Sequence, residues 1–200
     1  MKRKRLVIID LDHTLIHSRM SKHSMLKEAF RIKMPNDGTF YVHTRSFLRQ
    51  FINGLKQMIH DHPQTFKVAI WTAAQRDYAI KLMNRIWPQW ESDILFLRSY
   101  DHCSILTSGN NDEEIVVKDL TKLPQGYDSI LIDDNPLHYN INTANSFSVW
   151  KIKPFFFDTV DSELRDVLSY IKSSVTAGTT FAVRPKTPNL PLNTRNKSPI

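Results

Sequence analysis

The sequence predicts an α/β fold in which a parallel β-sheet is covered by helices on both faces. Short, continuous apolar runs occur at residues 6–9, 66–71 and 129–132, and such runs are typical of strands buried on both faces. Segments with apolar residues at helical spacing lie between these runs along the chain. Strands that alternate with amphipathic helices favour a parallel sheet.

Three helices follow from this spacing. Residues 46–60 carry an apolar stripe made of Leu48, Phe51, Ile52, Leu55 and Ile59. A second stripe predicts a helix over 75–87, which Pro88 ends. A third predicts a helix around 164–171, with Asp161 or Ser162 as its N-terminal cap.

Further strands are predicted at 39–43, 94–97 and 147–152. The segment 17–36 is polar, and no element is assigned to it. The turn sequence at 109–111, Gly-Asn-Asn, predicts that a short β-hairpin closes there.

The chain is expected to form one domain over 1–175, followed by a tail over 176–200. The tail holds four of the ten prolines, loses hydrophobic periodicity and has four basic but no acidic residues. Residues 2–5 are also all basic. The net charge of +7 therefore belongs to the two ends, while the body between them carries about −1. This distribution is weak support for a nucleic-acid-binding face.

Composition excludes several other classes. No apolar run is long enough to span a membrane, and the run at 6–9 is too short for a signal peptide. The one cysteine, Cys103, cannot form an internal disulfide, so a reducing, intracellular compartment is expected. Nuclear, cytoplasmic and host-delivered locations are not separated by these features.

Polar residues suited to chemistry follow four of the predicted strands. Asp10 and Asp12 come after the first strand, Thr72 after 66–71, Lys118 after 115–117, and the pair 133–134 (Asp-Asp) after 129–132. Ligands of open parallel sheets bind beyond the carboxyl ends of the strands. Carboxylates, a hydroxyl and an ammonium group at one such edge suit phosphoryl transfer with Mg²⁺, which prefers oxygen ligands.

Each position also has a structural interpretation. Thr72 with Gln75 fits a helix capping box, Lys118 alone fits a solvated surface lysine, and 133–136 fits a turn. The joint pattern favours the functional interpretation, because members of a site must share one location. Cys103 is expected to be a small buried residue and no nucleophile.

The same residues carry a resemblance to a known family. Four motifs resemble those of the haloacid dehalogenase (HAD) superfamily, and more narrowly its FCP/SCP-like branch of RNA polymerase II C-terminal-domain phosphatases: 10–15 (DLDHTL), 71–74 (WTAA), 117–120 (VKDL) and 132–136 (IDDNP). The resemblance implies a HAD-type Rossmann-like parallel sheet flanked by helices. It also implies a short hairpin insertion and no large cap, because the gaps between motifs are short.

The resemblance also implies a role for each residue. Asp10 is expected to be the nucleophile that forms an aspartyl-phosphate, and Asp12 the general acid and base. Thr72 and Lys118 are expected to bind the phosphoryl group. Arg98 either contacts the substrate or forms a structural ion pair.

The resemblance implies a metal site as well. Mg²⁺ is expected on the Asp10 carboxylate, the Asp12 backbone carbonyl and the pair Asp133 and Asp134. Of that pair, Asp134 is expected to be the direct ligand.

These expectations describe a Mg²⁺-dependent protein phosphatase acting on phosphoserine, phosphothreonine or phosphotyrosine. Two alternatives stay open at this point, a non-catalytic binding module with the same fold and a nucleic-acid 3′-phosphatase. The expected partner is a phosphorylated protein or peptide, and nucleic acid is disfavoured. The sequence leaves open the oligomeric state, the physiological substrate and whether residue 200 is the natural C-terminus.

Overall fold

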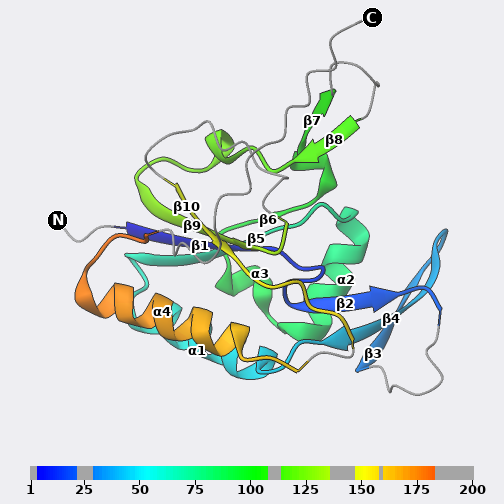
Figure 1. Ribbon diagram of the computed structural model, residues 1–200, viewed down its shortest axis with the longest axis horizontal. Helices are drawn as coiled ribbons and strands as arrows, with labels where there is room; N and C mark the ends of the chain where they lie inside the picture. The colour runs from blue at the N-terminus through cyan, green and yellow to red at the C-terminus, as the bar shows by residue number, and fades with distance from the viewer. Residues whose placement is uncertain (1–3, 22–28, 108–113, 136–146, 158–159, 183–200) are drawn as a thin grey trace, which may run out of the picture.

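A five-stranded parallel sheet forms the centre of the molecule (Figure 1). The computed structural model describes residues 4–21, 29–107, 114–135, 147–157 and 160–182. Within them the strand order is β10-β9-β1-β5-β6. The strands are β1 (Lys4–Ile9), β5 (Phe66–Trp71), β6 (Leu97–Arg98), β9 (Tyr127–Asp133) and β10 (Phe147–Lys151). The predicted parallel sheet is therefore confirmed.

The register of the central strands determines where the polar motifs lie. Ile9 at the end of β1 pairs with Ile70 of β5 on one side and with Ile132 of β9 on the other. The three strands consequently end at the same edge. The strand predicted at 94–97 corresponds to β6 at the edge of the sheet, which is shorter and begins later in the chain. Its ladder pairs with β5 are at Leu97 and Arg98.

Helices cover one face of the sheet. The helices α1 (Leu48–Asp61), α2 (Arg76–Ile86) and α4 (Glu163–Ala177) contribute side chains to one apolar cluster with β1 and β5. Figure 1 shows α1 and α4 side by side along this face. A side-chain carbon added at Gly54 of α1 would lie 2.6 Å from Leu168 of α4, so glycine permits this close helix contact.

Within the described residues the opposite face is covered mainly by irregular chain, and not by the second layer of helices that the sequence predicted. Leu6, Ile8 and Trp71 point to this side and pack with Leu120 and Leu123 in a second cluster. Leu120 opens the short 3₁₀ helix η2 (Leu120–Lys122). A further short helix, α3 (Trp90–Asp93), follows α2, and the 3₁₀ helix η1 (Tyr100–His102) follows β6.

A three-stranded antiparallel sheet lies beside the end of β1, and two of its strands were not predicted. Its order is β2-β4-β3, with β2 (Ile16–Arg19), β3 (Phe30–Met34) and β4 (Gly38–Thr44). Only β4 matches a predicted strand. The segment 17–36 is rich in polar residues, yet β3 alternates between exposed and buried positions as an amphipathic strand does. The overall polarity of the segment hid that alternation.

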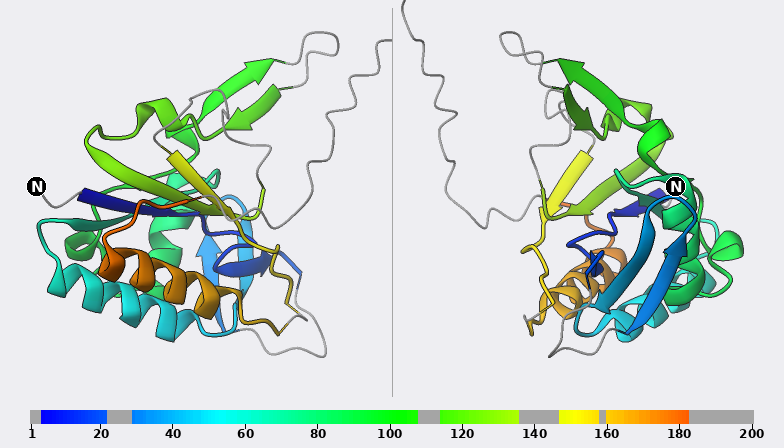
Figure 2. Two further views of the ribbon diagram at one scale, coloured as in Figure 1. Left: turned by 60° about the vertical axis from the view of Figure 1, so that its left-hand side comes forward. Right: turned by 90° about the vertical axis from the view of Figure 1, so that its right-hand side faces the viewer.

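The predicted hairpin is present. It consists of β7 (Ser104–Thr107) and β8 (Glu114–Val117), which pair antiparallel as a sheet of their own. Its turn, predicted at 109–111, lies outside the described residues. Figures 1 and 2 show the hairpin projecting from the side of the central sheet opposite α1 and α4. The strand β8 leads directly into Lys118.

Packing continues past the predicted end of the domain. The boundary expected after residue 175 falls inside α4, which ends at Ala177. Phe181 is buried: Ser148 Oγ donates to its carbonyl oxygen at 2.7 Å and its own N–H donates to Asp128 Oδ2 at 3.0 Å. The described part of the chain contains no helix that is long and apolar enough to cross a membrane.

Candidate active site

A tight loop after β1 places the first two aspartates at the edge of the sheet. The N–H of Asp10 donates to the Ile132 carbonyl at 3.0 Å, which ties this loop to β9. The Leu11 carbonyl then accepts hydrogen bonds from the N–H groups of residues 14, 15 and 16. His13, which lies in the loop between Leu11 and residue 14, has a φ of 59°, in the left-handed region. The chain therefore reverses within a few residues.

A buried ammonium group joins two of the motifs. Lys118 Nζ donates to Asp10 Oδ1 at 2.5 Å and to Asp133 Oδ2 at 2.7 Å. All three side chains are buried, with 3–8% of each exposed. Charge-assisted contacts of this length are among the strongest hydrogen bonds in proteins. Three strand ends predicted to converge are thus in direct contact.

The electrostatics of this group are dominated by burial. Burial raises the pKa of Asp10 to about 8, against the lowering effect of the nearby Lys118. Burial alone would lower the pKa of Lys118, but Asp10 and Asp133 outweigh it and raise that pKa. The ammonium therefore stays charged, and the carboxylates exceed it in number.

Three carboxylates gather where a cation would compensate them. Oxygen atoms of Asp10, Asp133 and Asp134 lie within 4.8 Å of one another. Asp133 already accepts from Lys118 Nζ and, at 2.8 Å, from the Asn135 N–H. Asp134 accepts a long hydrogen bond from Thr14 Oγ1 at 3.5 Å. Burial followed by the charge of Asp133 raises the pKa of Asp134.

These residues fit a magnesium ion. Every donor is a hard oxygen, as Mg²⁺ requires. Three carboxylates gather around one ammonium, so the site holds more negative charge than Lys118 neutralises. Both oxygens of Asp133 accept hydrogen bonds, from Lys118 and from the Asn135 N–H, whereas Lys118 contacts Asp10 at Oδ1. Asp10 and Asp134 are therefore the carboxylates best placed to bind the ion.

Asp12 lies in different surroundings. Its Oδ1 accepts hydrogen bonds from Tyr78 Oη at 3.0 Å and from Ser18 Oγ at 3.3 Å. Burial raises the pKa of Asp12, and the hydrogen bond from Tyr78 partly offsets this rise. Both donors to Oδ1 are neutral hydroxyl groups, and among the described residues the Asp12 carboxyl group forms no ion pair.

Thr72 follows β5 and is almost fully buried. Its N–H donates to the Arg98 carbonyl at 3.0 Å, and its Oγ1 accepts from the Ala74 N–H at 3.1 Å. The capping-box interpretation is wrong, because Gln75, and not Thr72, is the N-cap residue of α2. The Thr72 hydroxyl is free to donate its proton to a ligand at the sheet edge.

Arg98 is held by aromatic rings. Its guanidinium lies 4.8 Å from the ring centroid of Trp71 and 4.6 Å from that of Phe96, and it donates to the Lys122 carbonyl at 2.9 Å. Burial lowers its pKa. Among the described residues it has no carboxylate partner, so the predicted structural ion pair is absent there. Its contact with substrate stays a prediction.

Sequence reasoning assigned no role in the site to three residues that support it. Tyr78 belongs to the apolar stripe of its helix and was interpreted only as a core residue, while Ser18 lies in the segment without an assigned element. Arg45 is 2% exposed, and its guanidinium donates to the Thr14 carbonyl at 2.9 Å and to Asp161 Oδ1 at 3.0 Å. Arg45 therefore anchors the loop that carries Asp12.

The fold and the site together define a protein of the HAD phosphatase type, in its FCP/SCP-like branch. The chain also matches the family described as NLI interacting factor-like phosphatase over residues 5–182. It therefore belongs to that family.

Individual relatives are similar over most of this chain. CTD small phosphatase-like protein 3 of Caenorhabditis elegans is 27% identical over 176 residues, which cover 86% of this chain and 55% of that protein. The human CTD small phosphatase-like protein is 27% identical over 173 residues, 84% of this chain and 55% of that protein. The chain thus spans about half the length of these two relatives. Putative CTD phosphatase-like protein 355R of Invertebrate iridescent virus 3 is 28% identical over 179 residues, 80% of this chain and 89% of that protein.

A solved structure supports the fold. The fission yeast RNA polymerase II CTD phosphatase Fcp1 bound to beryllium fluoride superposes with a TM-score of 0.52 at 18% identity. The match covers 89% of this chain and 52% of that one. At this identity the likeness concerns the fold alone.

Proposed function

We propose that this chain is a Mg²⁺-dependent phosphatase that removes phosphate from phosphorylated serine, threonine or tyrosine in proteins. The observation that carries the proposal is the buried group in which Lys118 Nζ joins Asp10 and Asp133, with Asp134 beside them. A buried carboxylate beside a fixed ammonium and a cation site is an arrangement suited to attack on a phosphoryl group.

Asp10 is the proposed nucleophile. Lys118 holds Oδ1 and leaves the other oxygen for an in-line attack on phosphorus. The bond from Asp10 to phosphorus forms as the bond from phosphorus to the serine, threonine or tyrosine oxygen breaks. Asp10 must be ionised to attack, and burial opposes this. Lys118 and the metal ion offset that penalty.

The metal would be held by the Asp10 and Asp134 carboxylates and by the backbone carbonyl of Asp12. Asp133 positions Lys118 and lies next to the ion. When bound, Mg²⁺ offsets the charge of the carboxylates and of the phosphoryl oxygens.

Asp12 is the proposed general acid and base. Its raised pKa favours the protonated form that the first step needs, in which the proton goes to the leaving oxygen. In the second step water attacks the phosphorus of the aspartyl-phosphate, and Asp12 takes the proton of that water. The products are inorganic phosphate and free Asp10. Tyr78 and Ser18 hold Oδ1, so Oδ2 can carry the proton.

The remaining residues bind the phosphoryl group. The Thr72 hydroxyl would donate to a phosphoryl oxygen, and the Lys118 ammonium would neutralise developing charge. Each preorganised donor of this kind contributes roughly 2.7–4 kcal/mol to the transition state in comparable hydrolases. Arg98, which projects from the neighbouring strand β6, is proposed to contact the substrate nearby.

A phosphorylated protein is the proposed substrate. The described insertions are a three-stranded sheet and a hairpin, too small to enclose the site as a cap for small metabolites would. A peptide loop can enter such a site, and relatives are named CTD small phosphatase-like proteins. The complete set of charged site residues argues against a purely non-catalytic module. A single cysteine suits a reducing, intracellular compartment.

Hydrolysis of p-nitrophenyl phosphate tests the proposal. The purified chain should hydrolyse this substrate when Mg²⁺ is added, and a chelator should stop the hydrolysis. Asp10→Asn should abolish turnover, while the thermal unfolding of the variant stays cooperative. Activity near the wild-type level in Asp10→Asn would refute Asp10 as the nucleophile. A phosphopeptide array would then show which phosphorylated residues are preferred. A DNA 3′-phosphate substrate serves as the comparison for the nucleic-acid alternative.

A further inference from the structure

The three-stranded sheet has one face rich in cations and aromatic rings. The strand register places Arg19 beside Tyr41, and Tyr41 beside Arg31, so the three side chains share a face. His17 and Lys33 lie two residues along their strands and share it as well. We call this surface the outer face: His17, Arg19, Arg31, Lys33 and Tyr41. The opposite face is apolar, and its residues Ile32 and Val42 are buried.

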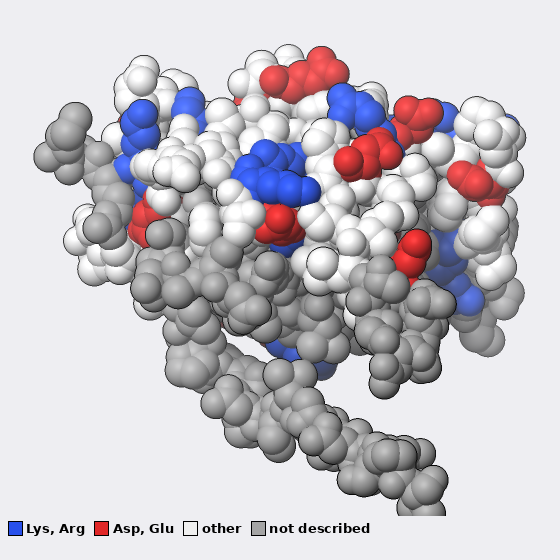
Figure 3. Space-filling view, turned by 90° about the horizontal axis from the view of Figure 1, so that it is seen from above, with Lys and Arg blue, Asp and Glu red and all other residues white. Residues whose placement is uncertain are grey.

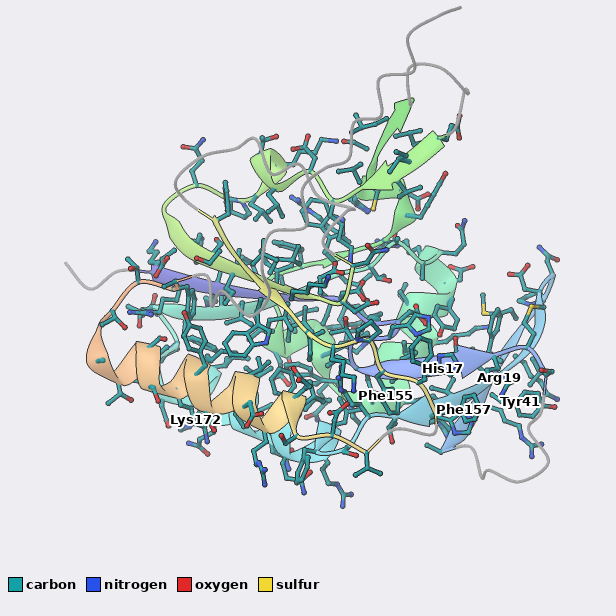
Figure 4. The ribbon with its side chains drawn as sticks, viewed as in Figure 1. His17, Arg19, Tyr41, Phe155, Phe157 and Lys172 are labelled. Atoms are coloured by element: carbon teal, nitrogen blue, oxygen red, sulfur yellow. The ribbon has the colours of Figure 1, made fainter. Side chains whose placement is uncertain are left out.

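Rings orient the cations of the outer face. The guanidinium of Arg19 lies 4.7 Å from the ring centroid of Phe157, and that of Arg31 lies 5.3 Å from the ring of Tyr41. Figure 4 shows His17, Arg19, Tyr41 and Phe157 gathered beside β2 and β4. An arginine that contacts a ring in this way can still bind carboxylate or phosphate through its N–H groups. Arg19 donates no hydrogen bond to the described residues, so this capacity is unused there.

The charge on this sheet has one sign. The strands β2, β3 and β4 contain Arg19, Arg31 and Lys33 and no acidic residue. Arg31 and Lys33 are exposed, and Arg19 is half-buried. The face of the molecule shown in Figure 3 differs, because acidic and basic side chains are interspersed across it. The strands that carry the outer face therefore favour anionic ligands.

The outer face continues from the rim of the active site. His13 directly follows Asp12, and its Nδ1 lies 3.3 Å from Nδ1 of His17. The His17 ring centroid in turn lies 5.7 Å from the ring centroid of Phe157, and the Arg19 guanidinium contacts the same ring. A polypeptide whose phosphorylated residue reaches Asp10 can pass over these residues and lie along the outer face.

We propose that the outer face binds an acidic or additionally phosphorylated stretch of the substrate polypeptide, next to the residue that is dephosphorylated. This inference rests on the proposed phosphatase function and specifies its substrate class. Charge complementarity favours this occupant, because carboxylates or phosphates in an extended chain can meet successive cations across the strands. The contribution is expected to fall with salt, as it does for exposed charges.

The test compares two phosphopeptides that differ only in the flanking residues, glutamate in one and glutamine in the other. The wild-type chain should have a higher kcat/KM for the glutamate peptide. Arg19→Gln and Lys33→Gln should each lower that kcat/KM by up to about fivefold, and the double variant by about tenfold, since exposed ion pairs contribute modestly. The glutamine peptide and p-nitrophenyl phosphate should be hydrolysed within about twofold of the wild-type rate.

Arg49→Gln is the matched control. It removes the same charge from an exposed position on α1, outside the outer face, and should leave all substrates unaffected. Circular dichroism establishes folding, and Lys33→Gln keeps the test valid if Arg19→Gln folds poorly. Equal kcat/KM for the two peptides with the wild-type chain, or an equal loss in Arg49→Gln, would overturn the inference.

Two further outcomes separate this inference from its rivals. Loss of p-nitrophenyl phosphate hydrolysis in the wild-type chain would refute the proposed function itself. Sedimentation with vesicles of phosphatidylserine and phosphatidylcholine tests a lipid surface as the occupant. Vesicle binding that the double variant loses, with no discrimination between the peptides, would overturn the inference in favour of lipid.

Discussion

The two aspartates of the first motif lie two residues apart but in opposite kinds of surroundings. Asp10 is in contact with the ammonium of Lys118, and two further carboxylates lie beside it. Asp12 is hydrogen-bonded to the hydroxyl groups of Tyr78 and Ser18. Burial raises the pKa of both. The partners, and not the burial, therefore distinguish them.

This difference assigns the two roles. A carboxylate beside a fixed cation and a metal site can be kept ionised, as a nucleophile must be. A buried carboxyl group held by neutral hydroxyl groups can gain and lose a proton, as a general acid and base must. One strand end thus presents two chemically distinct carboxyl groups. The following predictions test whether the partners create that distinction.

Replacing Lys118 should have the largest effect. Lys118→Met removes the cation that lowers the pKa of Asp10, so this pKa, already raised to about 8, should rise further and ionised Asp10 should be rarer at neutral pH. We expect kcat to fall by a factor on the order of 10²–10³, by comparison with the loss of a preorganised donor. Steady-state kinetics with p-nitrophenyl phosphate measure this.

The control is Lys151→Met, which alters an exposed lysine of β10. Activity of Lys118→Met within tenfold of wild type would show that Lys118 is only structural. Urea unfolding should accompany the kinetics, because removing one partner of a buried ion pair costs about 3–5 kcal/mol.

Magnesium affinity should depend on pH through Asp10. Because its pKa is raised to about 8 without metal, Mg²⁺ must displace a proton at lower pH. Affinity should therefore strengthen as pH rises toward about 8, by at most about tenfold per pH unit, and then level off. Thermal shift titrations with Mg²⁺ at several pH values measure this. A pH-independent affinity would contradict the raised pKa.

Loss of the Tyr78 hydroxyl should have a smaller and more specific effect. The hydrogen bond from Tyr78 lowers the pKa of Asp12, so Tyr78→Phe should raise it further. The basic limb of the kcat profile, where the general acid loses its proton, should shift to higher pH. We expect kcat to fall by about tenfold, consistent with one hydrogen bond worth about 1.5 kcal/mol.

Tyr170→Phe provides the comparison. Its hydroxyl donates to the Ala182 carbonyl at 2.9 Å and accepts from the Ala182 N–H at 2.7 Å, outside the catalytic residues. It should lose stability without any shift of the pH profile. An unshifted profile in Tyr78→Phe would separate Tyr78 from the chemistry.

Cys103→Ala should have the smallest effect. The thiol is half-buried, and burial raises its pKa, so it is a poor nucleophile at neutral pH. Activity should stay within about twofold of wild type and resist alkylating reagents. Inactivation by alkylation in the wild-type chain but not in Cys103→Ala would show that this thiol affects the site.

The sequence predicted the parallel sheet and the approach of Asp10 and Asp133 because both follow from period and register. Lys118 reaches the same edge from β8, which pairs with β7 outside that sheet. Continuous apolar runs indicate buried parallel strands, and polar residues at their carboxyl ends must share an edge. The hairpin before Lys118 was predicted for a similar reason, since its turn sequence is local. These features depend on short stretches of chain.

Features that depend on distant contacts were not predicted. The alternation of β3 indicates a strand only when β4 is present as its partner. The packing beyond residue 175 was not predicted because Phe181 contacts Tyr170 of α4 and Ser148 of β10, which are distant in sequence. The surroundings of Asp12 require Tyr78, which lies 66 residues away. A side chain on an apolar helical stripe gives no local sign that its hydroxyl reaches a carboxylate.

The central claim is that Asp10 accepts the phosphoryl group while Asp12 moves the proton. Mass spectrometry of the Asp12→Asn variant, incubated with substrate and Mg²⁺ and then denatured in acid, tests both parts together. The account predicts that the mass of one phosphoryl group is added to a peptide containing Asp10, because transfer still occurs slowly and hydrolysis is blocked. Phosphorylation of another residue, or the same adduct in Asp10→Asn with Asp12→Asn, would contradict it.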